Sequence, residues 1–217
     1  YIYKIMKIIS LIPLRGGSKG VPRKNIKLLN NKPLCYYSIN ESIKCNLIDE
    51  TWVSTDDDEI EQVCKKIGAK VHRRNPNCGL DNSSTDSVIR DFINKKGDNY
   101  IIILIQATNP FTKSIDLTNA INKFILNKYE LLVGVIESHT FLWKEYDGFI
   151  KQINPNIRQR QKSEKEYEED GSYYIFKKND FINNKYSLDF KKVGYNINST
   201  KFHIEIDEMI DWKIVEL

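Results

Sequence analysis

Short apolar runs that end abruptly in polar residues or glycine recur along this chain and alternate with helical patterns. The apolar runs are residues 8–14, 50–55, 70–73, 100–105 and 130–136. The segments with apolar residues at helical spacing are 34–44, 59–67, 86–95 and 114–128. This alternation predicts an α/β fold, with a mostly parallel sheet and helices on its faces. The 217 residues are enough for one sizeable domain, which we expect to span 1–217.

The residues that directly follow these runs are the first candidates for a binding site, because ligands of open α/β sheets bind beyond the carboxyl ends of the strands. They are Arg15, Asp56, Arg74 and Gln106. After the first run, residues 15–20 read Arg-Gly-Gly-Ser-Lys-Gly, and three glycines in five positions let the backbone turn tightly. Successive amides of such a loop can surround an anion.

Positive charge is concentrated around this loop. The first forty residues hold eight of the 33 Lys and Arg and none of the 29 Asp and Glu. Arg15, Lys19, Arg23 and Lys24 surround the loop, which suits a triphosphate. The Walker A spacing is absent, which disfavours a P-loop NTPase. The simpler alternative is a glycine turn with solvated cations.

A second candidate site lies near the carboxyl terminus. Residues 202–207 alternate apolar with polar, which predicts a strand that places Glu205 and Asp207 on one face, about 6.6 Å apart. Two neighbouring carboxylates repel, and a divalent cation is their usual compensation. Oxygen ligands favour Mg²⁺, which also binds nucleotide phosphates. The alternative is a solvent-facing pair on an edge strand.

The stretch 137–170 has no sustained period, so we expect an extended arm or a pair of hairpins. A long irregular segment of this kind is usually functional or contacts another subunit. After it, residues 171–176 read as a strand, and the acidic Asp211 is expected near the start of a last helix.

Composition excludes several classes of protein. The net charge of +4 is too small to indicate nucleic acid as a partner. No apolar run approaches the roughly 18 residues of a membrane helix. The four cysteines are far apart and lack zinc-ligand spacing, so we expect reduced packing residues. With no signal-peptide cleavage pattern, a cytoplasmic protein is expected, with the nucleus as the alternative in a eukaryote.

Several blocks of the sequence, in order, resemble the acylneuraminate cytidylyltransferases, which are CMP-sialic acid synthetases. The blocks are residues 14–20, 24–25, 52–56, 58–60, 71–74, 105–108, 206–207 and 210–212. The residues of these blocks resemble those of the animal-type enzymes more than those of most bacterial ones. The resemblance implies a Rossmann-like nucleotidyltransferase three-layer sandwich with a mostly parallel sheet, and a protruding dimerisation arm at 137–170.

The resemblance also implies an activity: a magnesium-dependent reaction of CTP with an N-acylneuraminate, a nine-carbon α-keto acid sugar, to give CMP-sugar and pyrophosphate. The expected assembly is a homodimer or a dimer of dimers. The matching triphosphate-loop residues are Arg15, Ser18, Lys24 and Asn25. The cytidine-side residues are Arg74, Ser83 and Ser84, and the sugar-side residues are Gln106, Arg160 and Tyr174. Glu205 and Asp207 would hold Mg²⁺, and Arg15, Lys24 and Asp207 would be catalytic.

The chain departs from the family pattern at Glu205, where the family usually has Asp, at Glu168, where some relatives have Arg, and at Asn109, where Ser is usual. Three alternatives therefore stay open. The sugar could be legionaminic, pseudaminic or 3-deoxy-manno-octulosonic acid. The chain could be a glycosyltransferase with the same type of sheet, which releases a nucleoside diphosphate. It could also be a nucleotide-binding relative that has lost turnover.

Overall fold

The computed structural model describes residues 6–75, 84–138, 140, 142–153, 165–200 and 204–216. Seven strands form one sheet in the order β11-β7-β10-β6-β1-β4-β5. Their bounds are β1 Lys7–Pro13, β4 Glu50–Thr55, β5 Lys70–Arg73, β6 Tyr100–Ile105, β7 Leu131–Ser138, β10 Glu166–Lys177 and β11 Val193–Ile197. Strand β10 runs antiparallel to both of its neighbours, and the other pairings in this sheet are parallel. The expectation of a mostly parallel sheet is confirmed.

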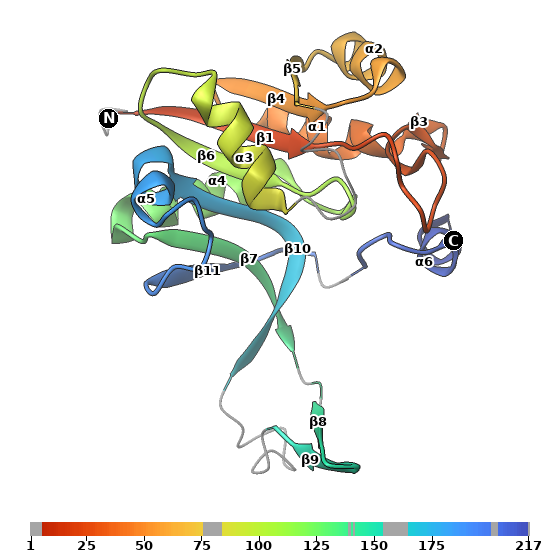
Figure 1. The fold of residues 1–217 in the computed structure, drawn as a ribbon, viewed down its shortest axis with the longest axis vertical. Coiled ribbons are helices and arrows are strands. Elements are labelled where there is room, and N and C mark those ends of the chain that lie inside the picture. Colours follow the sequence, from red (N-terminus) through yellow and green to blue (C-terminus); the bar gives the residue numbers. More distant parts are fainter. Residues whose placement is uncertain are drawn as a thin grey trace.

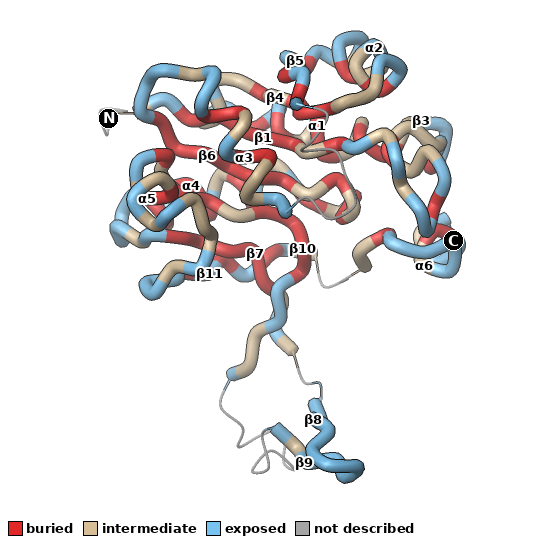
Figure 2. Tube along the Cα trace, viewed as in Figure 1, coloured by how far each residue is buried: buried red, intermediate tan, exposed pale blue. Residues whose placement is uncertain are grey.

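Helices cover both faces of the sheet (Figure 1). They are α1 Leu34–Lys44, α2 Asp58–Ile67, α3 Thr85–Asn94, α4 Ser114–Asn127 and α5 Lys178–Asn183. The last helix, α6 Met209–Glu216, lies beside the first loop and covers neither face. Successive strand residues point to opposite faces, so β1 contributes Ile8 and Ile12 to one core with α1, α2 and α4, and Ile9 and Leu11 to another with α3 and α5. The central strands are buried from both sides (Figure 2). The result is the expected three-layer sandwich.

Local chemistry explains where the helices begin and end. The Asp57 side chain accepts a hydrogen bond from the Ile60 amide (2.9 Å), which caps the start of α2. Gly68 ends this helix with a φ of 108°, a conformation that favours glycine. Ser84 caps α3 through a 3.3 Å bond that its hydroxyl accepts from the Ser87 amide.

The prediction for 137–170 is partly wrong at its borders. Strand β7 continues to Ser138 and β10 already begins at Glu166, because the two pair as an antiparallel ribbon that extends away from the body (Figure 1). Beyond this ribbon lies a hairpin of β8 (Trp143–Tyr146) and β9 (Phe149–Gln152), as expected for an arm. The hairpin is mostly exposed (Figure 2).

The prediction of a strand over 202–207 is wrong for residues 204–207, which form no strand, and 202 and 203 lie outside the described residues. The reason is that this segment is held by single contacts from loops and not by a strand ladder. The Ile206 amide donates to the Thr108 carbonyl (2.9 Å), and Lys24 Nζ donates to the Ile206 carbonyl (2.6 Å). The regular spacing of Glu205 and Asp207 along a strand is lost with it.

A short antiparallel pair, β2 (Leu28–Leu29) and β3 (Lys32–Pro33), joins the first loop to α1, after a 3₁₀ turn at Lys24–Ile26. Cys35, Cys45 and Cys64 are buried free thiols, as expected, and Cys78 lies outside the described residues. In the part of the chain that the structure describes, no helix is both long and apolar enough to cross a membrane.

Candidate active site

The carboxyl ends of β1, β4, β5 and β6 meet at one edge of the sheet, so the residues that follow them lie there together, as predicted. The Gly16 amide donates to Asp56 Oδ1 (3.2 Å), which joins the ends of β1 and β4. The Arg74 amide donates to the Thr55 carbonyl (3.0 Å), and its guanidinium donates to the Ser54 carbonyl. Arg74 is buried against β4, which fixes this cation beside the edge.

The glycine-rich loop is held by polar contacts from its own continuation. Asn25 is 6% exposed, and its side-chain amide donates to the Arg15 carbonyl (2.9 Å). This buried hydrogen bond fixes the start of the loop. The Arg23 guanidinium binds both oxygens of Asp57, at 2.5 and 3.0 Å, and also Glu59 at 2.5 Å. These contacts tie the loop to the start of α2 and leave the exposed Arg15 side chain at its rim.

Asp57 therefore has two structural tasks, and replacing it by alanine removes the cap of α2 and the partner of Arg23. We expect Asp57→Ala to lower the free energy of unfolding by about 1–2 kcal/mol at pH 7, mostly through the lost cap. Urea unfolding measures this. The control is Asp58→Ala, at a highly exposed neighbour, and an equal loss in both variants would contradict the assignment.

The effect of Asp57 depends on pH in a defined direction. The Arg23 guanidinium lowers the pKa of the Asp57 carboxyl from 3.8 to about 2. A lowered pKa in the folded state means that the stabilisation is present above pH 3.8 and is lost as the pH falls through about 2. The stability difference between the wild type and Asp57→Ala should shrink over this interval.

The carboxyl-terminal segment reaches the first loop, so the two candidate sites are one. Lys24 Nζ lies 2.9 Å from Asp207 Oδ1 and also donates to the Ile206 carbonyl. A Cβ atom placed on Gly20 would lie only 2.0 Å from the Asp207 carbonyl oxygen, so the two backbones are in direct contact. The Lys24 side chain is 12% exposed, whereas that of Asp207 is 65% exposed.

Helix α6 holds this convergence in place. Trp212 and Ile206 pack with Val21 and Leu34 into a small apolar core of their own, and Lys27 Nζ lies 4.7 Å from the centre of the Trp212 ring. Asp211 lies near the start of α6, as predicted. It accepts hydrogen bonds from the amides of Asp207 and Glu208, at 3.0 and 2.7 Å, and thus caps this helix. Figure 1 shows α6 beside the loop that precedes β3.

Gln106, one of the sugar-side candidates, lies at the carboxyl end of β6. This half-buried residue donates its backbone amide to the Ser172 carbonyl of β10 (2.9 Å). Glu205 packs against Gly171 in the same strand, since a Cβ atom on Gly171 would lie 1.5 Å from Glu205 Oε1. Gly171 has a φ of 61°, so glycine serves here both the backbone conformation and the close approach of Glu205.

The remaining predicted residues are less closely grouped. Ser18 is half-buried in the loop, where its amide contacts the Gly16 carbonyl (3.3 Å). The Tyr174 hydroxyl donates to Glu169 Oε2 (2.8 Å). The pKa of Tyr174 is raised mainly by burial and to a smaller extent by this hydrogen bond. The Ser84 hydroxyl is used in the helix cap. Ser83 and Arg160 lie outside the described residues.

Asp57 and Gly171 were missed as contributors to the site, and Gly20 was recognised only as part of the glycine-rich loop. The preference for Asp at helix starts could have identified Asp57 as the cap of α2. The contacts of Gly20 and Gly171 with residues 205–207 join distant parts of the chain, for which the sequence carries no local signal. Among the described residues, no three His, Cys, Asp or Glu side chains gather as a complete metal site.

Comparison with known proteins agrees with this geometry. Residues 9–214 match the protein family described as cytidylyltransferase. The chain is 36% identical to N-acylneuraminate cytidylyltransferase A of Danio rerio over 220 residues, which cover 98% of this chain and 51% of that protein. It is 37% identical to a pseudaminic acid cytidylyltransferase of Campylobacter jejuni over 137 residues, 61% of this chain and 59% of that protein.

The fold has a close structural counterpart. A CMP:2-keto-3-deoxy-manno-octonic acid synthetase complexed with CTP superposes with a TM-score of 0.73 over 97% of both chains, at 15% identity. This similarity confirms the Rossmann-like nucleotidyltransferase fold. The chain spans about half the length of the N-acylneuraminate cytidylyltransferases that it matches. On the match that spans residues 9–214, the chain belongs to the cytidylyltransferase family.

Proposed function

We propose that this chain transfers CMP from CTP to an N-acylneuraminate, a nine-carbon α-keto acid sugar, and releases pyrophosphate. Its main support is the contact of Lys24 with Asp207 and the Ile206 carbonyl, which joins the cationic loop to the acidic segment at one edge of the sheet. The animal relatives named N-acylneuraminate cytidylyltransferase favour this sugar class.

In this reaction the anomeric hydroxyl of the sugar attacks the α-phosphorus of CTP in line. The new bond joins the sugar oxygen to the α-phosphorus, the bond from this phosphorus to the bridging oxygen breaks with its electron pair leaving on pyrophosphate, and the hydroxyl proton passes to solvent water. Phosphoryl transfer gains most from positioning and electrostatics. Arg15 and Lys24 would stabilise the departing pyrophosphate. Arg74 and Ser84 would position the cytidine, and Gln106 and Tyr174 the sugar.

Mg²⁺ is the expected cofactor, and the chemistry of the residues fits it. Magnesium is bound in such sites by one or two carboxylates together with substrate phosphates. Asp207 offers an exposed carboxylate, and Glu205 a second one from the same segment. These two would hold the ion, which would neutralise charge on the phosphates and lower the pKa of the attacking hydroxyl.

The proposal is tested by incubating the chain with CTP, Mg²⁺ and N-acetylneuraminic acid and analysing the products by mass. CMP-sugar together with pyrophosphate is expected. Legionaminic, pseudaminic and 3-deoxy-manno-octulosonic acids are tested as alternative substrates. Pseudaminic acid is of particular interest because one relative is a pseudaminic acid cytidylyltransferase. A glycosyltransferase would form no pyrophosphate from CTP and would release a nucleoside diphosphate only when a finished sugar nucleotide is supplied in a second incubation. CTP binding without product in either incubation would indicate a relative that has lost turnover.

Lys24→Ala should mainly impair the use of CTP, because it removes a cation from the loop and two hydrogen bonds to the acidic segment. The proposed role of Lys24 is to bind the phosphates of CTP, and losing a hydrogen bond to a charged group of this kind should raise the KM for CTP about 10- to 100-fold. Steady-state kinetics with varied CTP measures it. Lys66→Ala, at an exposed position of α2, is the control. An unchanged KM for CTP would remove Lys24 from the site.

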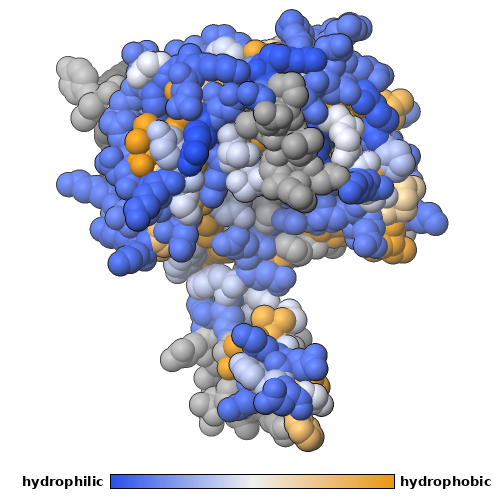
Figure 3. Space-filling view, in the orientation of Figure 1, coloured by the Kyte–Doolittle hydropathy of each residue, from blue (hydrophilic) through white to orange (hydrophobic). Residues whose placement is uncertain are grey.

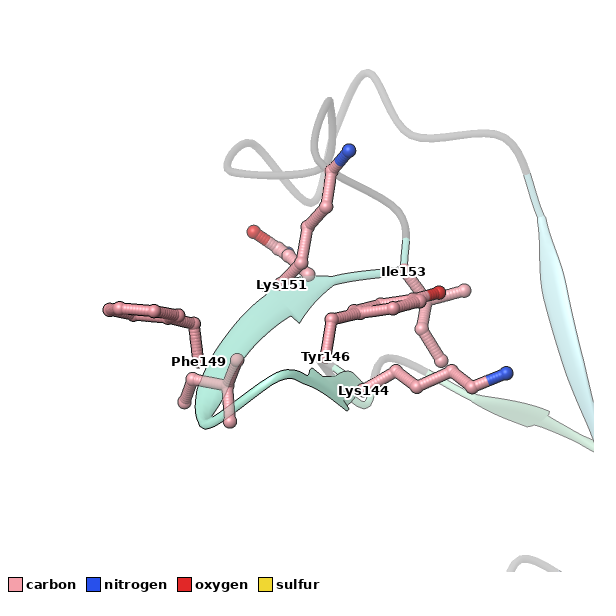
Figure 4. A pocket seen from close by; sticks show the side chains of 7 residues that line it. Lys144, Tyr146, Phe149, Lys151 and Ile153 are labelled. Atoms are coloured by element: carbon pink, nitrogen blue, oxygen red, sulfur yellow. The ribbon is translucent and has the colours of Figure 1, made fainter.

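We also propose a homodimer, or a dimer of dimers, in which the arm contacts a partner copy. The hairpin exposes large apolar side chains, with Phe149 at 79% and Ile150 at 67% exposure. Figure 3 shows hydrophobic residues on the arm among hydrophilic ones. The hairpin also forms a hollow of about 800 Å³. Lys144, Tyr146 and Phe149 are among the side chains that line it (Figure 4). Sedimentation of wild type and Phe149→Glu tests this, and a monomeric wild type would contradict it.

A further inference from the structure

A buried polar network lies behind Gln106 and Glu205, and its centre is Asp170, which is 3% exposed. The Asp170 carboxylate accepts three hydrogen bonds: from the Ser172 amide (3.1 Å), from Ser172 Oγ (2.5 Å) and from Asn198 Nδ2 (2.6 Å). Within the described residues, no lysine or arginine forms a salt bridge with Asp170. Burying a carboxylate costs free energy even when neutral donors satisfy it, so a buried carboxylate of this kind is expected to have a specific structural role.

The network fixes an irregularity in β10. The pairing of β10 with β7 shifts register between Glu169 and Tyr174, and the residues between these two, 170–173, form the irregularity. The opposite strand makes room for it, since a Cβ atom on Gly134 would lie 2.3 Å from Ser172 Oγ and 3.1 Å from Asp170 Oδ1. Bulges of this kind re-aim neighbouring groups and are common beside active sites.

The groups that this bulge re-aims are two of the candidate site residues. The Ser172 carbonyl accepts from the Gln106 backbone amide (2.9 Å), and Gly171 forms the surface on which Glu205 rests. The Asp170 carbonyl also accepts from Asn109 Nδ2 (2.6 Å), and Asn109 is 1% exposed in the loop after Gln106. Asp170 therefore contacts the β6 loop directly and is linked to the acidic segment through its neighbour Gly171.

We propose that Asp170 is a positioning residue: its carboxylate shapes the β10 bulge so that Ser172 holds Gln106 and Gly171 seats Glu205. This inference rests on the proposed function, because it assigns the two positioned residues to the sugar and cation side of the site. Asn25 and Arg23 hold the CTP loop through contacts that involve neither Asp170 nor the segment 204–207. Loss of Asp170 should thus affect the sugar more than CTP.

The donors and acceptors around Asn198 make a matched test available. Asn198 Oδ1 accepts from the Tyr173 hydroxyl (2.5 Å) and from Asn196 Nδ2 (3.2 Å), so its Nδ2 must face Asp170. Asp170→Asn would bring a second amide donor against this one, and neither side chain can turn without losing other bonds. The double variant Asp170→Asn/Asn198→Asp reverses the pair and restores one donor facing one acceptor.

For Asp170→Asn we expect kcat/KM for the sugar to fall by about tenfold or more, as for a lost hydrogen bond to a charged group, with the KM for CTP within about twofold of wild type. Amide hydrogen exchange at Gln106, which needs no substrate, should become faster. The double variant should recover both properties in large part. Asp189→Asn, at an exposed residue away from the network, is the control.

Wild-type sugar kinetics and Gln106 exchange in Asp170→Asn would overturn the proposal, as would equal losses for sugar and CTP that the double variant does not reverse. If Asp170→Asn does not fold, Ser172→Ala removes only the hydroxyl bonds and should show smaller changes of the same kind, and no change would again overturn it. A wild-type chain that makes no CMP-sugar refutes the proposed function, and Gln106 exchange then decides the positioning role by itself.

Discussion

Asp207→Ala is expected to lower CMP-sugar formation by about 10²–10³-fold, the effect of removing one preorganised electrostatic group from a reacting centre. The Asp207 carboxylate faces Lys24 at 2.9 Å in the first loop, and it is the more exposed of the two side chains. Its removal takes away one of the two carboxylates proposed for Mg²⁺ and leaves Lys24 without this partner. The rate of pyrophosphate release at saturating CTP and sugar measures the loss.

The stability of this variant separates a chemical role from a structural one. The Asp207 carboxylate is largely exposed, and Lys24 keeps its hydrogen bond to the Ile206 carbonyl when Asp207 is removed. An ion pair with an exposed partner contributes about 1 kcal/mol or less, so thermal unfolding of Asp207→Ala should stay close to that of wild type. Glu208→Ala, at the exposed next residue, serves as the control and should keep near-normal activity. Near-normal turnover of Asp207→Ala would show that the assignment of Asp207 to the reacting centre is wrong.

Gly20→Ala should be the second severe change. Its Cβ atom would lie 2.0 Å from the Asp207 carbonyl oxygen and 3.6 Å from the Glu208 Cα, and both are backbone atoms that no side-chain rotation can move. Either the loop or the segment 205–207 must shift, and a shift of this size costs about 1–3 kcal/mol in a packed region. We expect a large loss of activity because Lys24 and Asp207 separate.

A substitution of the same size at Gly97 provides the comparison. No atom lies within 4 Å of a Cβ placed there, and Gly97 is remote from the first loop, so Gly97→Ala should keep wild-type activity. Turnover and the KM for CTP would be measured for both variants. Equal activity of Gly20→Ala and Gly97→Ala would mean that the contact between the loop and Asp207 is unimportant for the reaction.

The strands and helices of the sheet were predictable because local signals define them. The strands at Glu50–Thr55, Lys70–Arg73 and Tyr100–Ile105 and the helix at Leu34–Lys44 have the predicted bounds. Continuous apolar runs and helix caps act over a few residues, so they can be recognised without knowledge of the contacts. The wrong prediction of a strand at 204–207 has a different cause. The apolar and polar residues of this segment alternate because they have separate neighbours: Ile206 packs with Trp212, and the backbone of the segment bonds to a loop.

The sequence by itself determined the α/β class, the cationic loop, the acidic segment and the resemblance to a cytidylyltransferase, because each is encoded in a contiguous pattern of residues. Only the tertiary structure decided that Lys24 meets Asp207, that Gly171 seats Glu205 and that Asp170 is buried behind Gln106. These contacts join residues up to 183 positions apart. Such pairings depend on strand order and loop packing, which no local pattern specifies.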